Sequence, residues 1–226
     1  MVLKLSESTL VLFDLDGTLV DSHEAIYDSA ISVLSQYSKR LPTKEEVFRS
    51  VGLPIKDLFS KFLNESVIDA AVPEFRNHLM EFGADKTKLL PNAIQTLEKF
   101  KSEDVNIGLV SNKQTALANS VLKQQNIDKY FDVVIGSDLG APKPSPEMIN
   151  LSLSKFPKTK FFVMVGDRLE DMIAAKLAGI RGIFIENQWN PTSNLETLLP
   201  FEPKVVKNLN QVFQAFIEMK GDLNVR

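Results

Sequence analysis

Short runs of apolar residues recur along the chain and predict the strands of a buried sheet. The runs are rich in β-branched and aromatic side chains and show little alternation with polar residues, which is typical of strands covered on both faces. The five predicted strands are Leu10–Leu15, Val105–Val110, Phe131–Ile135, Phe161–Val165 and Gly182–Ile185.

Several segments between and after these runs carry apolar residues at helical spacing. Alternation of strands and helices along a chain favours a parallel sheet with helices on both sides. We therefore expect an α/β protein with a Rossmann-like core. The predicted helices are Ala93–Phe100, Thr115–Gln124, Glu170–Leu177 and a C-terminal helix near Leu209–Met219 that covers the sheet.

The stretch from about Ser22 to Lys88 interrupts this alternation. It contains amphipathic helical periods separated by Leu41-Pro42-Thr43 and Gly52-Leu53-Pro54, and it shows no convincing strand. The simplest interpretation is an all-helical insertion between the first and second strands. We expect residues 1–20 and 89–226 to form the α/β core and residues 21–88 to form the helical domain.

Composition narrows the class of protein without naming a function. The chain has 226 residues, is 44% hydrophobic and 24% charged, and carries a formal charge of −3, which gives no electrostatic argument for nucleic acid or an anionic membrane. No run approaches the roughly 20 apolar residues of a membrane span, and the first residues do not resemble a signal peptide. With no cysteine, disulfides and thiolate chemistry are excluded. We expect a cytoplasmic monomer that binds neither nucleic acid nor membrane.

Polar side chains that could take part in catalysis or metal binding follow four of the predicted strands. In open α/β sheets, ligands bind just beyond the carboxyl ends of the strands, so these side chains should converge on one edge. Carboxylates crowded together need a cation, and a set of hard oxygen ligands without cysteine or suitably spaced histidine favours Mg²⁺. The residues in question are Asp14, Asp16, Ser111, Asn112, Lys143, Asp167 and Asp171.

Four short motifs, "DLDGT", "SN", "KPSP" and "GDxxxD", occur in this order at the predicted strand ends. In this order the motifs resemble those of the haloacid dehalogenase-like hydrolase superfamily, over roughly residues 8–20 and 90–220. The helical insertion looks like the cap domain of the first type in that superfamily. Within it, the chain most resembles phosphomonoesterases similar to phosphoglycolate phosphatase.

The resemblance implies distinct roles for the first two aspartates. Asp14 matches the nucleophile, a carboxylate that attacks phosphorus and forms an aspartyl-phosphate. Asp16 matches the general acid and base, which protonates the leaving alkoxide and later deprotonates water. Because side chains at i and i+2 of an extended segment point to the same side, we expect both carboxylates to face one phosphate. The resemblance also implies that the backbone carbonyl of Asp16 binds Mg²⁺.

The remaining motif residues are expected to bind the phosphoryl group. Gly17 permits a tight turn and close approach of the backbone to substrate. Thr18 and Ser111 offer hydroxyl donors, and the backbone at Asn112 precedes a helix whose N-terminus favours an anion. Lys143, between prolines in "PKPSP", should offset the charge of the phosphoryl group and of the nucleophile.

Two further aspartates complete the expected metal site, which comprises Asp14, Asp16, Asp167 and Asp171. Asp167 should bind Mg²⁺ directly, whereas Asp171, four residues later on the same helical face, should hold a water on the metal or Lys143. Arg168 stands where many relatives carry a small polar residue. Its charge either lies near the site or faces solvent.

Two residues of the insertion are weaker candidates for contact with substrate. His23 follows the "DLDGT" loop closely, at the expected hinge of the cap. Arg49 falls in "FRSVGLP", where related caps place loops that select the substrate.

Together these features predict a Mg²⁺-dependent phosphatase that hydrolyses the phosphomonoester of a small metabolite, either phosphoglycolate-like or a sugar phosphate, through an aspartyl-phosphate. A sugar-phosphate mutase resembling β-phosphoglucomutase remains an alternative, because the same core chemistry serves both reactions. A non-catalytic phosphate-binding protein that keeps the fold is a third hypothesis. A dehalogenase is disfavoured, because dehalogenases lack the second aspartate and need no metal.

Overall fold

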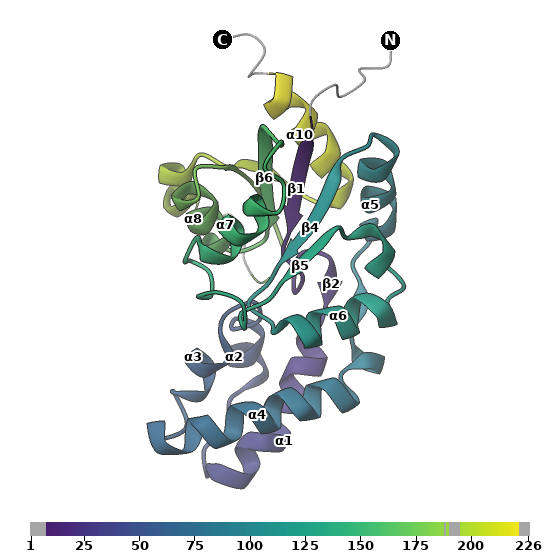
Figure 1. The fold of residues 1–226 in the computed structure, drawn as a ribbon. Helices are drawn as coiled ribbons and strands as arrows, with labels where there is room; N and C mark the ends of the chain where they lie inside the picture. The colour runs from purple at the N-terminus through teal and green to yellow at the C-terminus, as the bar shows by residue number, and fades with distance from the viewer. Residues whose placement is uncertain (1–7, 188, 190–194, 222–226) are drawn as a thin grey trace.

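A six-stranded parallel sheet in the order β5-β4-β1-β6-β7-β8 forms the centre of the molecule (Figure 1). The computed structural model describes residues 8–187, 189 and 195–221. The first strand, β1, is central and pairs with β4 on one side and β6 on the other. The predicted α/β fold is confirmed. The strands are β1 Thr9–Phe13, β4 Asn106–Val110, β5 Val133–Ile135, β6 Phe161–Gly166, β7 Arg181–Ile185 and β8 Lys204–Val206.

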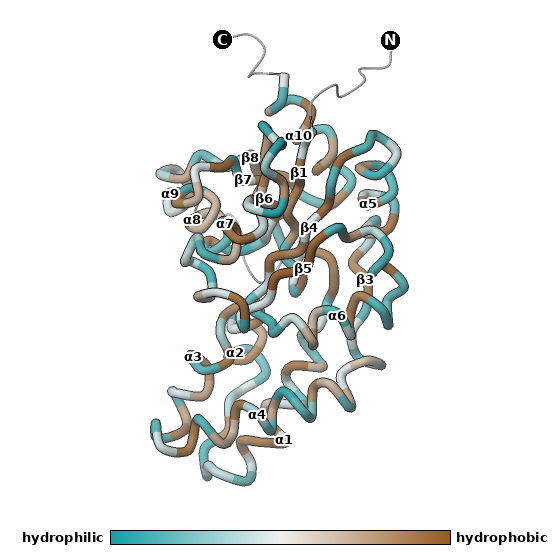
Figure 2. Tube along the Cα trace, viewed as in Figure 1, coloured by the Kyte–Doolittle hydropathy of each residue, from teal (hydrophilic) through white to brown (hydrophobic). Residues whose placement is uncertain are grey.

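Helices cover both faces of this sheet, because alternate side chains of each strand point to opposite sides. Val11 and Phe13 of β1 pack with α5, α6 and α10, whereas Leu10 and Leu12 pack with α7 and α8 on the other face. Figure 2 shows the central strands as the most continuously hydrophobic part of the chain. The helices are α5 Ala93–Ser102, α6 Thr115–Gln124, α7 Glu147–Ser154, α8 Leu169–Leu177, α9 Leu195–Leu198 and α10 Val212–Gly221.

Four helices between β2 and β3 form the insertion, and they pack around a separate hydrophobic cluster to which the core adds Leu117 of α6. The longest two, α1 and α4, lie side by side beyond the carboxyl ends of the central strands (Figure 1). A reciprocal capping box starts α2: Thr43 Oγ1 accepts from the Glu46 amide, and Glu46 Oε2 accepts from the Thr43 amide. The insertion comprises α1 His23–Tyr37, α2 Lys44–Phe48, α3 Ile55–Phe59 and α4 Glu65–Phe82.

The structure contains elements that periodicity did not predict. A two-stranded antiparallel ribbon, β2 Val20–Asp21 with β3 Lys88–Leu89, joins the insertion to the core. Each strand has only two residues, too few to show alternation. Helix α7 was also not predicted. Short 3₁₀ helices complete the described chain: η1 Ala84–Lys86, η2 Asp128–Tyr130, η4 Leu199–Phe201 and η5 Leu209–Gln211.

The first strand ends two residues earlier than predicted, at Phe13 rather than Leu15. The chain turns there because the Leu15 carbonyl accepts the backbone N–H groups of Leu19 and Val20. Gly17 has φ +88° within this turn, a conformation that favours glycine. As a result, Asp16 lies in the turn and not in an extended strand.

Candidate active site

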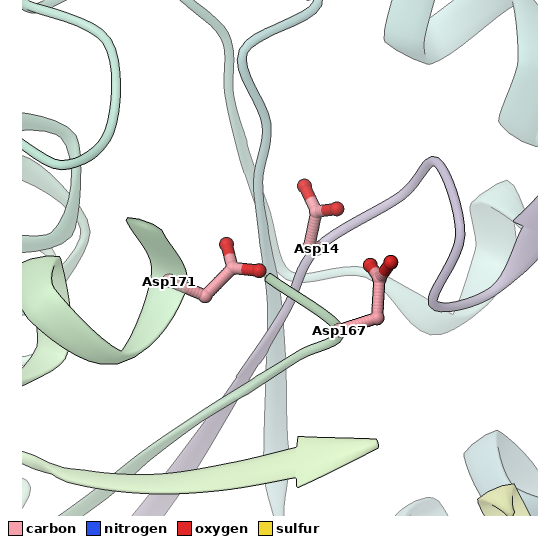
Figure 3. Close-up of side chains that lie close together, drawn as sticks. All are labelled: Asp14, Asp167 and Asp171. Carbon is pink, nitrogen blue, oxygen red and sulfur yellow. The ribbon is translucent and has the colours of Figure 1, made fainter. Parts of the chain in front are cut away.

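Three aspartates from separate segments converge at the carboxyl end of the sheet. Asp14 follows β1, Asp167 follows β6 and Asp171 lies in the first turn of α8 (Figure 3). One carboxylate oxygen of each lies within 4.8 Å of the others, and all three residues are buried. The parallel sheet therefore brings together residues separated by more than half of the chain, as the strand-end pattern predicts.

Lys143 supplies the positive charge at the centre of this cluster. Its Nζ donates to Asp14 Oδ1 at 2.7 Å, to Asp171 Oδ1 at 2.6 Å and to the Val110 carbonyl at 3.0 Å. Its side chain is 2% exposed. Burial by itself lowers the pKa of Lys143. The nearby carboxylates of Asp14 and Asp171 have the larger combined effect and raise this pKa above its ordinary value. The lysine is therefore charged and orients two carboxylates.

One lysine does not balance three buried carboxylates. Burial raises the pKa of Asp14 to about 8, with the charges of Asp171 and Asp167 adding to the effect and Lys143 opposing it. Burial also raises the pKa of Asp167 to about 6. Such shifts show that the site is short of positive charge, because buried carboxylates retain protons unless a cation pairs with them.

The residues present fit a magnesium ion. Asp14, Asp167 and Asp171 offer hard carboxylate oxygens at mutual distances that one cation can bridge, and no histidine or cysteine belongs to the group. Mg²⁺ is usually held by one or two carboxylates, waters and substrate phosphate. Asp171 accepts on both oxygens, from the cationic Lys143 and from the Arg168 amide. Asp14 accepts from Lys143 on Oδ1 alone, and the side chains of Thr18 and Asn187 that donate to Asp167 are neutral, so Asp14 and Asp167 are the better direct ligands.

Two side chains donate hydrogen bonds to Asp167, and the backbone of Gly17 passes close to its carboxylate. Thr18 Oγ1 donates to Asp167 Oδ1 at 2.9 Å, and Asn187 Nδ2 donates to Oδ2 at 2.8 Å. A Cβ at Gly17 would lie 2.5 Å from Asp167 Oδ2, so only glycine lets the turn approach this carboxylate. Thr18 was expected to donate a hydrogen bond to the phosphate, but its hydroxyl donates to Asp167 instead.

Asp16 points away from the other carboxylates. Its Oδ1 accepts from Ser22 Oγ at 2.5 Å, and its Oδ2 pairs with Lys113 Nζ at 3.0 Å. The expectation that Asp14 and Asp16 project to the same side assumed an extended segment, whereas the chain turns at this point. Asp16 instead faces the helical insertion, beside a cavity.

Ser111 and Asn112 lie at the end of β4, at the edge where the carboxylates converge. Ser111 Oγ accepts from the Lys113 amide at 3.2 Å, and its own proton has no acceptor among the described residues, which leaves it available to an anion. The Asn112 side chain connects two loops: its Oδ1 accepts from the Lys143 amide, and its Nδ2 donates to the carbonyls of Gly52 and Lys143.

A cavity of about 410 Å³ lies between the insertion and the core, beside Asp16. Core residues such as Asp16, Asn112 and Lys113 line one side of it, and residues of α3 and α4 line the other. This volume is within the range of about 300–1,000 Å³ that is typical of small-molecule sites. We call it the Asp16 cavity.

The structure does not bring His23 or Arg49 to the Asp16 cavity. His23 is buried, with its Nδ1 2.7 Å from Asp21 Oδ1, and its ring packs against Phe48 and Trp189. The Arg49 side chain is 70% exposed and pairs with Glu45. Both candidates were chosen from their position in the chain, which does not determine where a helical side chain points.

Arg168 anchors the insertion to the core. Its guanidinium donates to the carbonyls of Arg49 at 3.1 Å and Val51 at 2.8 Å. Gly52, with φ +86°, lies directly against it, and a Cβ there would be 2.8 Å from Arg168 Cδ. Of the two alternatives for Arg168, the structure therefore places the charge at the loop 49–52 that borders the site.

We expect Arg168→Gln to loosen the insertion from the core, because it removes the guanidinium donors to the two carbonyls. Trp189, the single tryptophan, follows β7 but packs against Phe48 of the insertion, with ring centroids 4.9 Å apart. Loosening of the insertion would expose Trp189 to water, so the tryptophan fluorescence emission maximum should shift to longer wavelength in the variant. Arg40→Gln is the control, because the Arg40 side chain belongs to the insertion and is 74% exposed. Identical fluorescence emission from the two variants would contradict the role of Arg168 in holding the insertion against the core.

Three residues near the site were not assigned roles from the sequence. Lys113 directly follows Ser111 and Asn112, so its position at a strand end was an available signal. Asn187 follows the last predicted strand, which was not searched for polar residues. Arg76 lines the Asp16 cavity from α4, and nothing in the helical pattern distinguishes it.

Comparison with known proteins identifies the family of the chain. A family model described as haloacid dehalogenase-like hydrolase matches residues 11–185. The chain is 31% identical to the pyrophosphatase PpaX of Bacillus velezensis, over 86% of this chain and 89% of that protein. It is 32% identical to a phosphoglycolate phosphatase of Aquifex aeolicus, over 76% of this chain and 82% of that protein.

A solved structure shows the same fold. The crystal structure of a predicted phosphatase from Clostridium acetobutylicum superposes with a TM-score of 0.82, at 23% identity, over 94% of this chain and 100% of that one. The chain therefore belongs to the haloacid dehalogenase-like hydrolase family, and the predicted resemblance is confirmed. It is a phosphatase-type hydrolase of that family. In the described ranges, no helix combines the length and the apolar character needed to cross a membrane.

Proposed function

We propose that the protein is a Mg²⁺-dependent phosphatase that hydrolyses the phosphomonoester of a small metabolite through an aspartyl-phosphate on Asp14. The observation that carries this proposal is the position of Asp14, buried at a strand end between Lys143 and two further carboxylates. The names of the relatives, pyrophosphatase and phosphoglycolate phosphatase, support a small phosphorylated substrate.

In the first step, an oxygen of Asp14 attacks the phosphorus of the ester, and the bond from phosphorus to the leaving oxygen breaks. Asp16 donates a proton to that oxygen, so that the leaving group departs as an alcohol. Lys143 donates hydrogen bonds that stabilise charge on Asp14 and on the phosphoryl group. Ser111 donates its free proton to a phosphoryl oxygen.

In the second step, a water attacks the phosphorus of the aspartyl-phosphate. Asp16 accepts a proton from this water, the bond between phosphorus and Asp14 breaks, and inorganic phosphate leaves. When bound, Mg²⁺ neutralises negative charge on the carboxylates and on the transferring phosphoryl group. Asp14 and Asp167 would hold it, while Asp171 positions Lys143.

We further propose that residues 21–88 form a cap that covers the site and selects the leaving group. The Asp16 cavity is consistent with this role, since the proton donor to the leaving oxygen lies at its wall. The contacts of Arg168 and Asn112 with the loop 49–52 hold the cap against the core. A covered site excludes water during the first displacement.

Hydrolysis of p-nitrophenyl phosphate, followed as release of inorganic phosphate, tests the proposed function. We expect turnover with Mg²⁺ and at most background rates after chelation by EDTA. Assay of sugar phosphates for isomer formation tests the mutase alternative. Isomer formation without phosphate release would contradict the phosphatase proposal, and absence of Mg²⁺-dependent hydrolysis would favour the non-catalytic hypothesis.

Magnesium affinity should increase with pH between about 6 and 8. Burial raises the pKa of Asp14 to about 8 and that of Asp167 to about 6, so both groups lose protons across this range when Mg²⁺ binds. Metal binding that displaces a proton weakens as pH falls through the pKa of the ligand. We expect the Kd for Mg²⁺, measured by calorimetry, to fall at least about 10-fold. In Asp14→Asn the Kd for Mg²⁺ should vary less with pH. A Kd that does not change with pH in the unmodified protein would contradict the assignment of Asp14 and Asp167 as ligands.

A further inference from the structure

The Asp16 cavity is larger and more apolar than phosphate binding requires. Beyond the charged groups near Asp16, much of its wall is made of aliphatic and aromatic side chains of the insertion and of α6. Asp14, Ser111 and Lys143 do not line the cavity, so the phosphate site lies next to it, and about 410 Å³ leaves room for an organic leaving group beside the phosphate. The apolar wall residues that matter most here are Ile55, Leu58, Phe75, Leu79 and Leu117.

Three cationic side chains also line this cavity, and two of them are paired. Lys113 Nζ lies 3.0 Å from Asp16 Oδ2, and Lys56 Nζ lies 3.0 Å from Asp69 Oδ1. Arg76 differs, because no described residue makes a hydrogen bond or an ion pair with its guanidinium. The cavity therefore contains one cation that is available to a ligand.

The surroundings of Arg76 favour an anion. The side chain is half-buried on α4, and burial lowers the pKa of its guanidinium while the charge of Asp138 opposes this effect. Among the described residues, no hydrogen bond or ion pair joins Asp138 to this guanidinium, and Asp138 Oδ1 accepts instead from the amide and hydroxyl of Thr115. A partly desolvated guanidinium without a close partner gains most from a carboxylate or phosphate, which it binds with two parallel hydrogen bonds.

We propose that Arg76 binds an anionic group at the far end of the leaving group. The substrate is then a phosphomonoester whose leaving group has an apolar middle and a terminal carboxylate or second phosphate. This inference rests on the proposed function, because it assigns the leaving group of that reaction. A neutral leaving group leaves the guanidinium of Arg76 unpaired when the cavity is filled, and inorganic pyrophosphate offers nothing to the apolar wall.

A series of synthetic esters tests this assignment directly. The probes are alkyl monophosphates of increasing chain length, each ending in a methyl group, a carboxylate or a second phosphate. At the chain length that reaches Arg76, we expect kcat/KM for one anionic ester to exceed that for the methyl ester by at least about 10-fold. The carboxylate and phosphate arms show which anion is preferred.

Replacement of Arg76 shows whether this residue is responsible for the preference. In Arg76→Gln the ratio of kcat/KM between the anionic and methyl esters should fall to about 1, mainly through KM, because the charge pairing is lost while the apolar wall remains. Arg76→Lys should restore part of the ratio. Arg49→Gln is the matched control, since Arg49 is an exposed arginine of the same insertion that does not line the cavity, and it should keep the full ratio.

The outcomes separate this inference from the proposed function. If the unmodified protein hydrolyses the esters without preference for an anion, or if Arg76→Gln keeps the preference, the assignment of Arg76 is overturned and the phosphatase proposal stands. If no ester is hydrolysed with Mg²⁺ present, the proposed function fails and the inference fails with it. Because the chain-length series uses the unmodified protein, it gives a result even if a variant does not fold.

Discussion

Replacing Asp14 by Asn abolishes turnover of phosphate esters, with an expected fall in kcat of about 10⁴-fold or more. The amide oxygen of asparagine is a poor nucleophile, so no covalent bond to phosphorus forms. Acid-quenched mass spectrometry should detect a phosphorylated form of the unmodified protein during turnover and none of the variant. Phosphate release, measured with p-nitrophenyl phosphate and Mg²⁺, gives the rate.

The same variant should remain folded. Burial raises the pKa of Asp14 well above its ordinary value, so the site favours the neutral form of this side chain and a neutral amide replaces it closely. The asparagine oxygen also keeps an acceptor for Lys143 Nζ. Asp104→Asn is the control, because Asp104 is exposed with φ +58°, a conformation that asparagine also adopts. Appreciable turnover by Asp14→Asn would sink the nucleophile assignment.

Lys143→Met should destroy both activity and much of the stability. The substitution leaves buried Asp14 and Asp171 without their common cation, and removal of one partner from a buried ion pair costs about 3–5 kcal/mol. Urea unfolding near pH 8 without metal measures this loss. Turnover of p-nitrophenyl phosphate should fall together with it, because Lys143 also stabilises the phosphoryl group.

The stability loss in Lys143→Met should shrink at acidic pH. Burial raises the pKa of Asp14 and the charge of Lys143 opposes this effect, so without the lysine the pKa of Asp14 lies still further above its unfolded value. A group whose folded pKa is raised in this way binds protons more tightly in the folded state, so stability is regained as pH falls through that pKa. Unfolding near pH 5.5 should therefore show a smaller difference from the unmodified protein. Lys123→Met, at an exposed lysine of α6, should change little at either pH, and an equal loss at both pH values for Lys143→Met would refute this account.

Most of the core could be predicted from the sequence because its elements are long enough to show periodicity. The five apolar runs match β1, β4, β5, β6 and β7 within two residues at each end, and Thr115–Gln124 is predicted with its observed bounds. The ribbon of β2 and β3 was missed because a two-residue strand carries no period. The predicted ends 1–7 and 222–226 of the core lie outside the described residues.

The candidate site was predictable for a topological reason. Parallel strands end at one edge, so chemistry-bearing residues that follow different strands must meet there. This places Asp14, Ser111, Lys143 and Asp167 together without any knowledge of side-chain conformation. Their catalytic roles stay predictions, which the Asp14 and Lys143 variants test.

The direction of individual side chains was not predictable in the same way. Asp16 was expected beside Asp14, but the turn at Gly17 points it toward Ser22 and Lys113. Thr18 was expected on the phosphate, but it donates to Asp167. In both cases the side chain contacts a residue that is far away in the sequence, Lys113 for Asp16 and Asp167 for Thr18, and local spacing carries no information about such contacts.

By itself, the sequence determined the order of most core strands and helices along the chain, the edge at which the polar residues gather, and the family to which the chain belongs. These depend on local periodicity and on motifs that stand at strand ends. Only the tertiary structure decided what faces the leaving group. The insertion is joined to the core by one short ribbon and the contacts of a few side chains, so its packing selects Arg76 for the cavity and leaves Arg49 in solvent, although helical spacing treats both alike.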